Sequence, residues 1–524
     1  MPATTNKKDQ IKKMEFLLPV LSAVLLVFAS PNFGLWALVW LALVPLFIAL
    51  KNKNFKQTIV LGLIFGFASY IGYLFWLPIS AFHITNSYWL AILVWILASA
   101  YPALSLTLSC ILYNFIRKYF VEIKTSFLYK LAAIIAIPSL WVALEFAQFK
   151  LFKGFPYVYY FLGASQWNDI YILQIASFVG EIGISFIIVL VNYSLFRLLE
   201  NRKAKEVIFS ALILTVCVAY GVWILNFKAP LKTDSKNTIK AVVLNGNIDS
   251  MIKWQNKEKV GDYIAQTYLD LNKKAVSENP NLIIWTETAI PWPMEPGDDL
   301  IEASLNITQP SGAYHIIGMP SYAKDNKVLD SAFFITPDGL VTGEYDKQNL
   351  IDFVESDAKF GSALSVKIGE SGANNIPGER HLPLDGPLGK IGVLICNENL
   401  YQDYTRTIAK NGAKFLVTTG NDSLLANDTI IKNHFIHNAF RAVENRKDVV
   451  IAINSGISGL VDAYGRTVVA SFEKEAHIVP VTVTEREQTS FYTKYGDVFM
   501  YFCILFGLIS VVSSFYLSKQ KDGK

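Results

Sequence analysis

Three side chains of complementary chemistry stand out in the second half of the chain: a cysteine, a glutamate and a lysine. Cys396 lies in "KIGVLICNENL", Glu287 in "NLIIWTETAIP" and Lys347 in "GEYDKQNLIDFVE". A thiol is mostly protonated at neutral pH, so a cysteine nucleophile needs a base or a neighbouring cation. Glu287 could accept the thiol proton, and Lys347 could stabilise a thiolate and then the oxyanion of a tetrahedral intermediate. Together the three side chains form a set for acyl transfer that requires no metal.

Predicted strands would position these side chains. Glu287 and Cys396 follow short apolar runs, Leu282–Trp285 and Ile391–Ile395, that are typical of buried strands. Lys347 follows the predicted hairpin "SAFFITPDGLVTG", which has a Pro-Asp-Gly turn. Strand ends are where α/β sheets present catalytic side chains. Taken alone, the glutamate and the lysine would more often be solvated surface residues, and only their occurrence with the cysteine favours a site.

The cysteine count supports a chemical role for Cys396. The chain has four cysteines, and Cys110, Cys217 and Cys503 fall inside apolar stretches of membrane-spanning length. Cys396 is therefore the one cysteine predicted in a globular region. The charge pattern described below places this globular region outside the cytoplasm, where cysteines are usually paired. An unpaired cysteine there suggests a thiol kept for chemistry. The alternative is that Cys396 is a small buried hydrophobic residue.

Other kinds of catalytic or metal site have weaker support. The segment "NSGISG" (454–459) lacks the G-x-S-x-G spacing of a serine nucleophile. The six histidines show no zinc-type pairing, and "HFIH" (434–437) is interpreted as one face of a helix rather than a metal site. We expect neither a metal nor another cofactor.

The composition indicates a membrane protein. Of the 524 residues, 52% are hydrophobic, and the mean hydropathy of +0.34 is too high for an ordinary soluble protein. The alternative, core helices of a soluble protein, is disfavoured because so many uncharged runs cannot all fit in one core. No small-residue cleavage site separates the first two runs, so the first is expected to be a span rather than a signal peptide. Eight membrane spans are predicted, at about 15–30, 34–50, 58–80, 88–114, 129–149, 171–196, 207–227 and 497–517.

Lysine and arginine clusters predict the orientation of these spans. Positive residues precede the first span, fill the second, fourth and sixth loops and follow the last span, whereas the loop around His83 has none. The positive-inside rule then places both termini in the cytoplasm and the large globular region outside. The predicted parts are a membrane domain (1–227), a catalytic domain (228–496), and an eighth helix with a cytoplasmic tail (497–524). The net charge of +4 gives no reason to expect a nucleic-acid partner.

The catalytic segments resemble a known superfamily. Glu287, Lys347 and Cys396 are similar to the Glu-Lys-Cys triad of the nitrilase (carbon-nitrogen hydrolase) superfamily, as is "RAVENR" followed by "NSGISG". A nitrilase-like domain between seven spans and one span resembles the apolipoprotein N-acyltransferase family of the bacterial inner membrane. The membrane segments "PNFG", "VPLF", "LWVALEF", "KGFPY" and "SQW" are similar to the same family. The resemblance implies a multi-pass α-helical membrane domain of eight transmembrane helices with an inserted α/β domain, an α-β-β-α sandwich in the periplasm.

The resemblance also implies a two-step reaction. Cys396 would take the sn-1 acyl chain of a phospholipid, typically phosphatidylethanolamine, as a thioester. The α-amine of a diacylglyceryl-modified cysteine at an apolipoprotein N-terminus would then accept the acyl chain. Glu287 would act as the base and Lys347 would stabilise the oxyanion.

Further residues receive supporting roles from the same resemblance. Glu355 would hold Lys347, and Glu398 follows the nucleophile as it does in the family. Trp254 and Asn397 would contact the substrate, although Trp254 could equally be an aromatic residue at the membrane interface.

The chain departs from the family pattern at several positions. Asn397 stands where tyrosine usually follows the nucleophile, and Ile451 stands where an arginine is common. Leu424 and Leu425 replace two aromatic residues, and Gln148 replaces an arginine. None of these belongs to the triad, so we expect them to affect the choice of donor lipid and acceptor rather than the reaction type.

Other functions stay open on the sequence alone. A membrane-anchored amidase would pass the same thioester to water. A transporter or receptor would need ionisable residues along a pathway, and Glu145 and Glu181 are the candidates in the predicted spans. A catalytically dead nitrilase-like scaffold is the remaining alternative.

Overall fold

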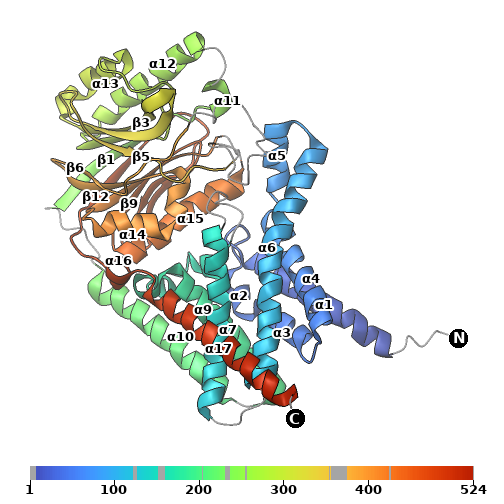
Figure 1. Ribbon diagram of the computed structural model, residues 1–524. Coiled ribbons are helices and arrows are strands. Elements are labelled where there is room, and N and C mark those ends of the chain that lie inside the picture. The colour runs from blue at the N-terminus through green and yellow to red at the C-terminus, as the bar shows by residue number, and fades with distance from the viewer. Residues whose placement is uncertain are drawn as a thin grey trace. The chain divides into compact units, whose positions relative to one another are not determined.

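The computed structural model describes residues 7–121, 127–151, 160–202, 204–229, 237–253, 257–352, 355, 375–423 and 427–522. It contains two compact units (Figure 1). The helical unit comprises Met1–Lys153, Tyr157–Trp223 and Asp497–Lys524, and the α/β unit comprises Gly154–Pro156 and Ile224–Gly496.

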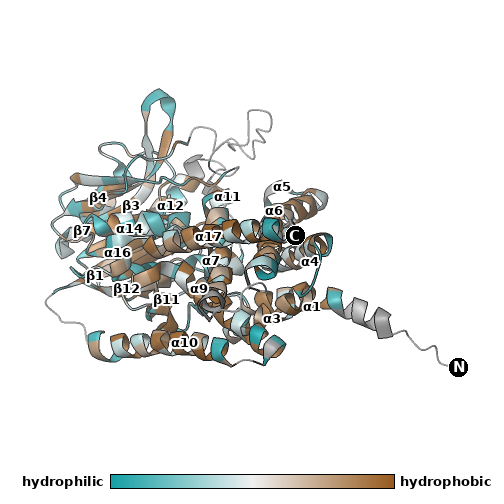
Figure 2. Ribbon diagram, turned by 60° about the horizontal axis from the view of Figure 1, so that its bottom comes forward, coloured by the Kyte–Doolittle hydropathy of each residue, from teal (hydrophilic) through white to brown (hydrophobic). Residues whose placement is uncertain are grey.

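Apolar helices make up the helical unit, and hydrophobic residues dominate them (Figure 2). Small residues allow close packing: a Cβ atom at Gly66 would lie 2.6 Å from the carbonyl oxygen of Ala103. The helices are α1 (Lys7–Ala29), α2 (Val39–Ala42), α3 (Val44–Leu50), α4 (Phe55–Tyr73), α5 (Leu77–Thr85), α6 (Tyr88–Ile116), α7 (Phe127–Leu151), α8 (Ile170–Leu173), α9 (Ala176–Asn201), α10 (Lys205–Trp223) and α17 (Val498–Asp522).

Six of the eight predicted membrane spans coincide with described helices that are long and apolar enough to cross a membrane. These helices are α4, α6, α7, α9, α10 and α17. The first two predicted spans instead coincide with shorter apolar helices, Glu15–Ala29 and Trp36–Leu50. The predicted span 58–80 covers both α4 and α5, because the chain leaves the helix between Tyr73 and Leu77.

The polar residues singled out in the predicted spans are buried within the helical unit. Glu145 on α7 accepts a hydrogen bond from the indole nitrogen of Trp141 at 2.8 Å. Gln148, which stands where the family commonly has arginine, donates to the hydroxyl of Tyr70 at 2.9 Å. Glu181 on α9 is fully buried. Contacts inside the helical unit thus hold Glu145 and Gln148.

Two six-stranded sheets form the centre of the α/β unit, in the orders β12-β1-β2-β3-β4-β5 and β11-β10-β9-β8-β7-β6. In the first sheet β1, β2 and β3 are parallel, and in the second β7, β8 and β9 are parallel. The strands are β1 (Thr238–Asn245), β2 (Leu282–Trp285), β3 (Tyr314–Tyr322), β4 (Val328–Ile335), β5 (Val341–Asp346), β6 (Leu384–Gly386), β7 (Gly389–Ile395), β8 (Phe415–Asn421), β9 (Val449–Asn454), β10 (Ser458–Val461), β11 (Thr467–Ser471) and β12 (His477–Thr484).

Helices cover both sides of the paired sheets. In Figure 1, α12 (Lys257–Val276) and α13 (Asp299–Thr308) lie on one side, and α14 (Gln402–Lys410) and α15 (Asp428–Asn445) lie on the other. The short helices α11 (Ser250–Lys253) and α16 (Phe491–Tyr495) complete the described helices of this unit. The layers therefore form the α-β-β-α sandwich that the resemblance implied.

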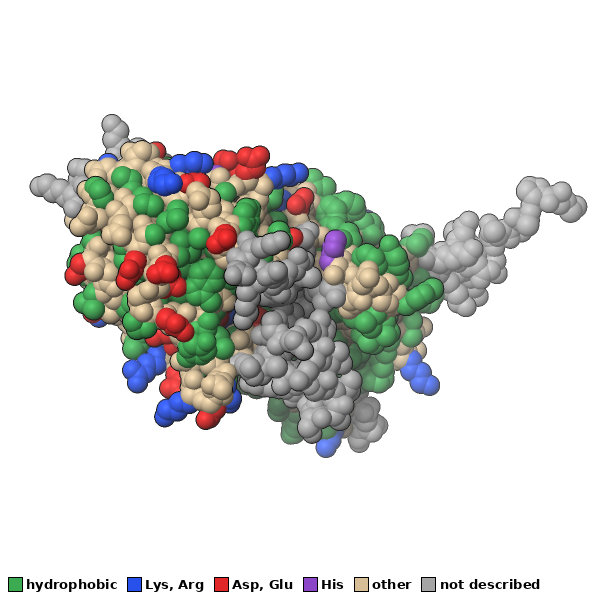
Figure 3. Space-filling view, turned by 90° about the horizontal axis from the view of Figure 1, so that it is seen from above, with side chains coloured by type: hydrophobic (Ala, Val, Ile, Leu, Met, Phe, Trp, Pro, Cys, Tyr) green, Lys and Arg blue, Asp and Glu red, His purple; other side chains and the backbone are tan. Residues whose placement is uncertain are grey.

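Burial explains the apolar runs that predicted the strands. All four residues of β2 are buried, because a parallel strand inside the sandwich has side chains packed on both faces. On the helix side of the first sheet, the ring of Tyr268 from α12 stacks on Trp285 with centroids 4.3 Å apart. On the face of the α/β unit seen in Figure 3, acidic and basic side chains are interspersed with apolar ones, as is usual for a domain surface in water.

Candidate active site

The three predicted catalytic residues follow three different strands. Glu287 comes just after β2, Lys347 directly after β5 and Cys396 directly after β7. All three are buried: Lys347 is 0% exposed, Glu287 4% and Cys396 5%. Neither Glu287 nor Lys347 is a solvated surface residue, which is the alternative that each would favour when taken alone.

Lys347 is the centre of an ionic cluster. Its ammonium nitrogen lies 2.7 Å from Glu287 Oε1 and 2.6 Å from Glu355 Oε1. Glu355 Oε2 in turn accepts a hydrogen bond from the backbone nitrogen of Ile351 at 2.9 Å. Asp330 on β4 is a third carboxylate, with Oδ2 3.7 Å from the ammonium. The sequence analysis did not identify Asp330, whose position on β4 gives no hint of this contact.

The charges of this cluster shift several pKa values. Burial lowers the pKa of the Lys347 ammonium, but the negative groups around it raise that pKa well above its ordinary value. Burial raises the pKa of Glu287, and the charge of Lys347 lowers it to a net value below the ordinary one. Burial and the charge of Glu287 hold the pKa of Asp330 well above its usual range. Glu287 is thus the more readily ionised of these two carboxyl groups and could serve as a base, whereas Asp330 more readily holds a proton.

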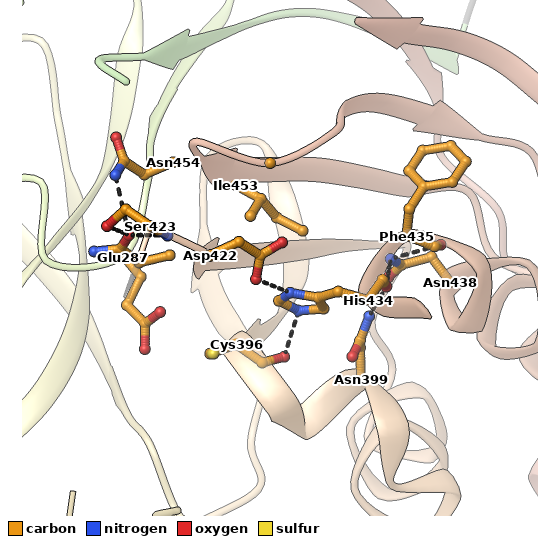
Figure 4. A network of polar contacts seen from close by, with 12 residues as sticks. Glu287, Cys396, Asn399, Asp422, Ser423, His434, Phe435, Asn438, Ile453 and Asn454 are labelled. Carbon is orange, nitrogen blue, oxygen red and sulfur yellow. Dashed lines mark hydrogen bonds and ion pairs between the residues drawn. The ribbon is translucent and has the colours of Figure 1, made fainter. Parts of the chain in front are cut away.

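Cys396 begins a short 3₁₀ helix, η8 (Cys396–Leu400), in a strained conformation. Its φ of 53° lies in the left-handed region, which costs a residue with a Cβ atom about 1–3 kcal/mol. Figure 4 shows its sulfur directed toward the side on which the carboxylate of Glu287 lies. Burial and the charge of Glu287 raise the pKa of the Cys396 thiol well above its ordinary value. Cys396 therefore holds a neutral thiol, and a base would have to deprotonate it before it could act as a nucleophile.

Glu398 joins the loop after β7 to the loop after β5. Its carboxylate accepts hydrogen bonds from the backbone nitrogens of Ile395 at 2.8 Å and Gln348 at 2.7 Å. It also accepts one from the hydroxyl of Tyr345 at 2.9 Å. Burial raises the pKa of Glu398 to about 7. The residue thus connects the loops that carry Cys396 and Lys347.

Of the remaining predicted residues, two are buried in the α/β unit and three lie outside the described part of the chain. Asn397 is fully buried next to the nucleophile, and neither polar atom of its side chain has a hydrogen-bond partner among the described residues. Ile451 is a buried residue of β9. Trp254, Leu424 and Leu425 lie outside the described residues.

The sequence analysis missed a second polar pair beside the cysteine. His434 on α15 lies with Nδ1 2.9 Å from Asp422 Oδ1 and with Nε2 2.9 Å from the carbonyl oxygen of Cys396 (Figure 4). The interpretation of "HFIH" as part of a helix is confirmed, but the contact of His434 with the nucleophile had no local sequence signal. Within the described part of the chain, no cluster of histidine, cysteine, aspartate and glutamate could hold a metal ion.

Comparisons with known proteins agree with this arrangement of two units. Residues 22–194 match the model of the apolipoprotein N-acyltransferase N-terminal domain, and residues 240–489 match that of carbon-nitrogen hydrolases. The apolipoprotein N-acyltransferase of Geobacter metallireducens is 31% identical over 516 residues, which are 95% of this chain and 94% of that protein. The Thermotoga maritima enzyme of the same name is 25% identical over 525 residues, 97% of this chain and 96% of that protein. With both domains in one chain and similarity over nearly its full length, the protein belongs to the apolipoprotein N-acyltransferase family.

Proposed function

We propose that this acyltransferase, which N-acylates bacterial apolipoproteins, uses a phospholipid donor and a thioester on Cys396. The observation that carries the proposal is the buried contact of Lys347 with Glu287, beside a neutral thiol on a strained turn. The acceptor is a diacylglyceryl-modified cysteine at the lipoprotein N-terminus. The donor is a membrane phospholipid, with phosphatidylethanolamine as the first candidate.

In the first step, the carboxylate of Glu287 accepts the proton of the Cys396 thiol. The sulfur attacks the sn-1 ester carbonyl, and the oxyanion that forms is stabilised by the Lys347 ammonium. The bond between the carbonyl carbon and the glycerol oxygen then breaks, and that oxygen takes the proton held by Glu287. A lysophospholipid leaves, and the acyl chain remains as a thioester.

In the second step, the α-amine of the lipoprotein attacks the thioester carbonyl and gives a proton to Glu287. The bond between carbon and sulfur breaks, and the leaving thiolate recovers a proton from Glu287. The products are an amide and the starting thiol. No metal or oxidant takes part in either step.

Neighbouring residues keep these groups in place. Glu355 is bonded to the Lys347 ammonium, so the ammonium stays oriented while Glu287 gains and loses a proton. Glu398 connects the loops of Cys396 and Lys347. The unpaired amide of Asn397 is a candidate partner for a polar group of a lipid substrate. Trp254 is assigned to substrate binding by resemblance alone.

Lipid substrates explain why a membrane domain accompanies the catalytic domain. Lifting an acyl chain from a bilayer into water costs about 0.8 kcal/mol per CH₂ group, so a site at the bilayer surface avoids most of that cost. We propose eight membrane-crossing segments in residues 1–227 and 497–524, including the two shorter apolar helices Glu15–Ala29 and Trp36–Leu50. In this arrangement both termini are cytoplasmic, and the catalytic domain, 228–496, faces the periplasm of a bacterial inner membrane.

Intact mass of the purified protein tests the thioester. The protein is incubated with phosphatidylethanolamine in detergent without an acceptor, beside Cys396→Ala and the matched control Cys503→Ala, whose cysteine lies on α17. We expect one added acyl chain, released by neutral hydroxylamine, in the wild type and in Cys503→Ala only. An adduct on Cys396→Ala, or none on the wild type with any bilayer phospholipid, would contradict the mechanism.

A second arm separates the transferase from a membrane-anchored amidase. The loaded protein is divided between buffer and buffer with a diacylglyceryl lipopeptide. A transferase passes the acyl chain to the lipopeptide amine, whereas an amidase releases a free fatty acid in both samples at the same rate.

A further inference from the structure

His434 makes two contacts that restrict its protonation. Its Nε2 faces the carbonyl oxygen of Cys396 and its Nδ1 faces the carboxylate of Asp422, each at 2.9 Å. A carbonyl and a carboxylate only accept hydrogen bonds, whereas a neutral imidazole has a single N–H. Both contacts are therefore hydrogen bonds when the ring carries both protons and Asp422 supplies the counter-charge.

The surroundings of the ring favour that charged form. Burial lowers the pKa of His434, but Asp422, the carbonyl of Cys396 and the more distant Glu287 raise it to a net value above the ordinary one. These are the groups that act on the ring: Asp422 follows β8, Cys396 begins η8 and Glu287 follows β2. A protonated His434 thus sits between the nucleophile's backbone and a carboxylate.

The chain makes room for this pair. A Cβ atom at Gly420 would lie 2.8 Å from Cε1 of His434, and one at Gly456 would lie 2.7 Å from Oδ2 of Asp422. Asn399 and Asn438 both donate side-chain hydrogen bonds to the backbone carbonyl of His434, at 2.8 and 3.0 Å. Two glycines therefore leave space for the two side chains, and two asparagines hold the turn of α15 that carries the imidazole.

The hydrogen bond from His434 is made to the backbone of Cys396, which has a strained conformation. Cys396 has a φ of 53°, and the carbonyl that His434 holds is its own. A hydrogen bond at that oxygen resists rotation of the peptide group that follows Cys396. Figure 4 shows the imidazole on one side of the residue and the sulfur pointing away from it, toward the side of Glu287.

We propose that His434, held by Asp422, is a positioning residue that fixes the Cys396 backbone so that the thiol faces Glu287 and Lys347. The proposal rests on the proposed nucleophilic role of Cys396. It assigns His434 no contact with the substrate and no proton transfer in the reaction. Loss of the pair would leave the thiol present but misdirected, and a misplacement of about 1 Å reduces a rate by roughly 100-fold.

The test compares Asp422→Leu and His434→Gln with the wild type in the full-length protein in detergent. Asp422→Leu keeps the approximate size of the side chain but removes the acceptor that holds Nδ1, whereas an asparagine amide could still donate to Nδ1 of a neutral ring. The matched control is His437→Gln, on the same helix and half-buried. Two rates are measured by intact mass: acylation of Cys396 by phosphatidylethanolamine and alkylation of Cys396 by iodoacetamide.

We expect both variants to lose roughly 100-fold in acylation rate with an unchanged half-saturating lipid concentration, whereas His437→Gln matches the wild type. Alkylation should slow as well. In both variants all of the protein should still react, only more slowly. A merely structural defect would instead leave a misfolded fraction that takes no acyl chain.

Two outcomes separate this proposal from the proposed function. Folded variants that are acylated and alkylated at wild-type rates would overturn the positioning role while leaving the thioester mechanism intact. A wild type that is alkylated faster than both variants but takes no acyl chain from any phospholipid would support the positioning role and contradict the proposed donor chemistry.

Discussion

The two sheets of the α/β unit share one strand plan. Each has an antiparallel edge strand, three parallel strands and two further antiparallel strands. The middle parallel strand of each is followed by a carboxylate, Glu287 after β2 and Asp422 after β8. Each carboxylate meets a basic side chain: Glu287 contacts Lys347, which follows β5, and Asp422 contacts His434 on α15.

The Glu287–Lys347 pair and the Asp422–His434 pair differ in the polar groups that contact them. The Glu287–Lys347 pair has two further carboxyl groups, Glu355 and Asp330, next to the ammonium. The pair of Asp422 and His434 contacts a backbone carbonyl instead. In the proposed mechanism, the first sheet thus supplies the proton acceptor and the positive charge, whereas the second supplies the thiol and holds its backbone.

Hydrogen bonds across the sandwich join the two contributions. Asn245 at the end of β1 donates to the carbonyl of Ile453 on β9 at 2.9 Å. Asn454 exchanges hydrogen bonds with the backbone of Ile248 at 3.0 and 2.7 Å. Neither sheet alone holds a complete set of reactive groups, so the chemistry depends on their stacking. The following experiments test this division.

Removing the thiol of Cys396, which follows a strand of the second sheet, should have the largest effect on the rate of lipopeptide acylation. We expect Cys396→Ala to lower the rate of lipopeptide acylation by more than about 10⁴-fold, because no other group forms the thioester. Cys396→Ser should be nearly as poor, since the weakly acidic hydroxyl is a worse leaving group in the second step. A radiolabelled lipopeptide assay measures both. Residual acylation above about 1% would show that the first sheet can catalyse direct transfer.

Removing the charge of Glu287, the proposed base, should have the second-largest effect on the acylation rate. Glu287→Gln keeps the shape of the side chain but cannot accept the thiol proton, so the acylation rate should fall by about 10²–10⁴-fold. The loss should diminish at high pH, where the thiol ionises without a base. A pH series of single-turnover acylation measures this. A uniform loss at every pH would mean that Glu287 only orients Lys347.

Removing the protonated imidazole of His434 should lower the free energy of unfolding by an amount that depends on pH. The folded-state pKa of His434 is raised above the unfolded-state pKa of about 6.5. Protonated His434 therefore stabilises the folded state fully at pH values below the unfolded-state pKa. The stabilisation is lost as the pH rises through the folded-state pKa. His434→Gln should therefore be less stable than the wild type by about 1–2 kcal/mol near pH 6 and by less near pH 9. Thermal unfolding in detergent at both pH values measures the difference, and a gap that widens with pH would contradict the charged form.

The smallest effect is expected at Asp330. Burial and the charge of Glu287 raise the pKa of its carboxyl, which favours the protonated form, and asparagine has nearly the same shape as a protonated aspartic acid. Asp330→Asn should therefore reduce acylation by only about twofold to threefold at neutral pH. A much larger loss would show that Asp330 is ionised and that Lys347 needs all three carboxylates.

Local patterns predicted the parts of the site that lie at strand ends. The apolar runs before Glu287 and Cys396 exist because parallel strands in a sandwich are buried on both faces. The layers of the fold and the roles of Glu355 and Glu398 came from the resemblance. The pair of Asp422 and His434 could not be predicted, because the two residues meet only when α15 packs against the second sheet. Asp330 could not be identified from the sequence, because its contact with Lys347 depends on how β4 pairs with β5.

Hydropathy predicted the membrane character and the two apolar helices near the start of the chain, but it did not predict where every helix breaks. Composition shows how apolar a segment is, not where its backbone turns. The described apolar helices Glu15–Ala29 and Trp36–Leu50 are separated by a turn that contains Gly34, with φ of 75°. The break between α4 and α5 likewise falls inside a continuous apolar run.

The neutral thiol of Cys396 has a consequence for survival of the protein under oxidative stress. Peroxides and disulfides react with thiolates, not with protonated thiols. Burial and the charge of Glu287 raise the pKa of this thiol, which keeps the sulfur protonated. The other three cysteines are free and buried in the helical unit. The same burial that makes Cys396 depend on a base therefore also protects the resting nucleophile from oxidation.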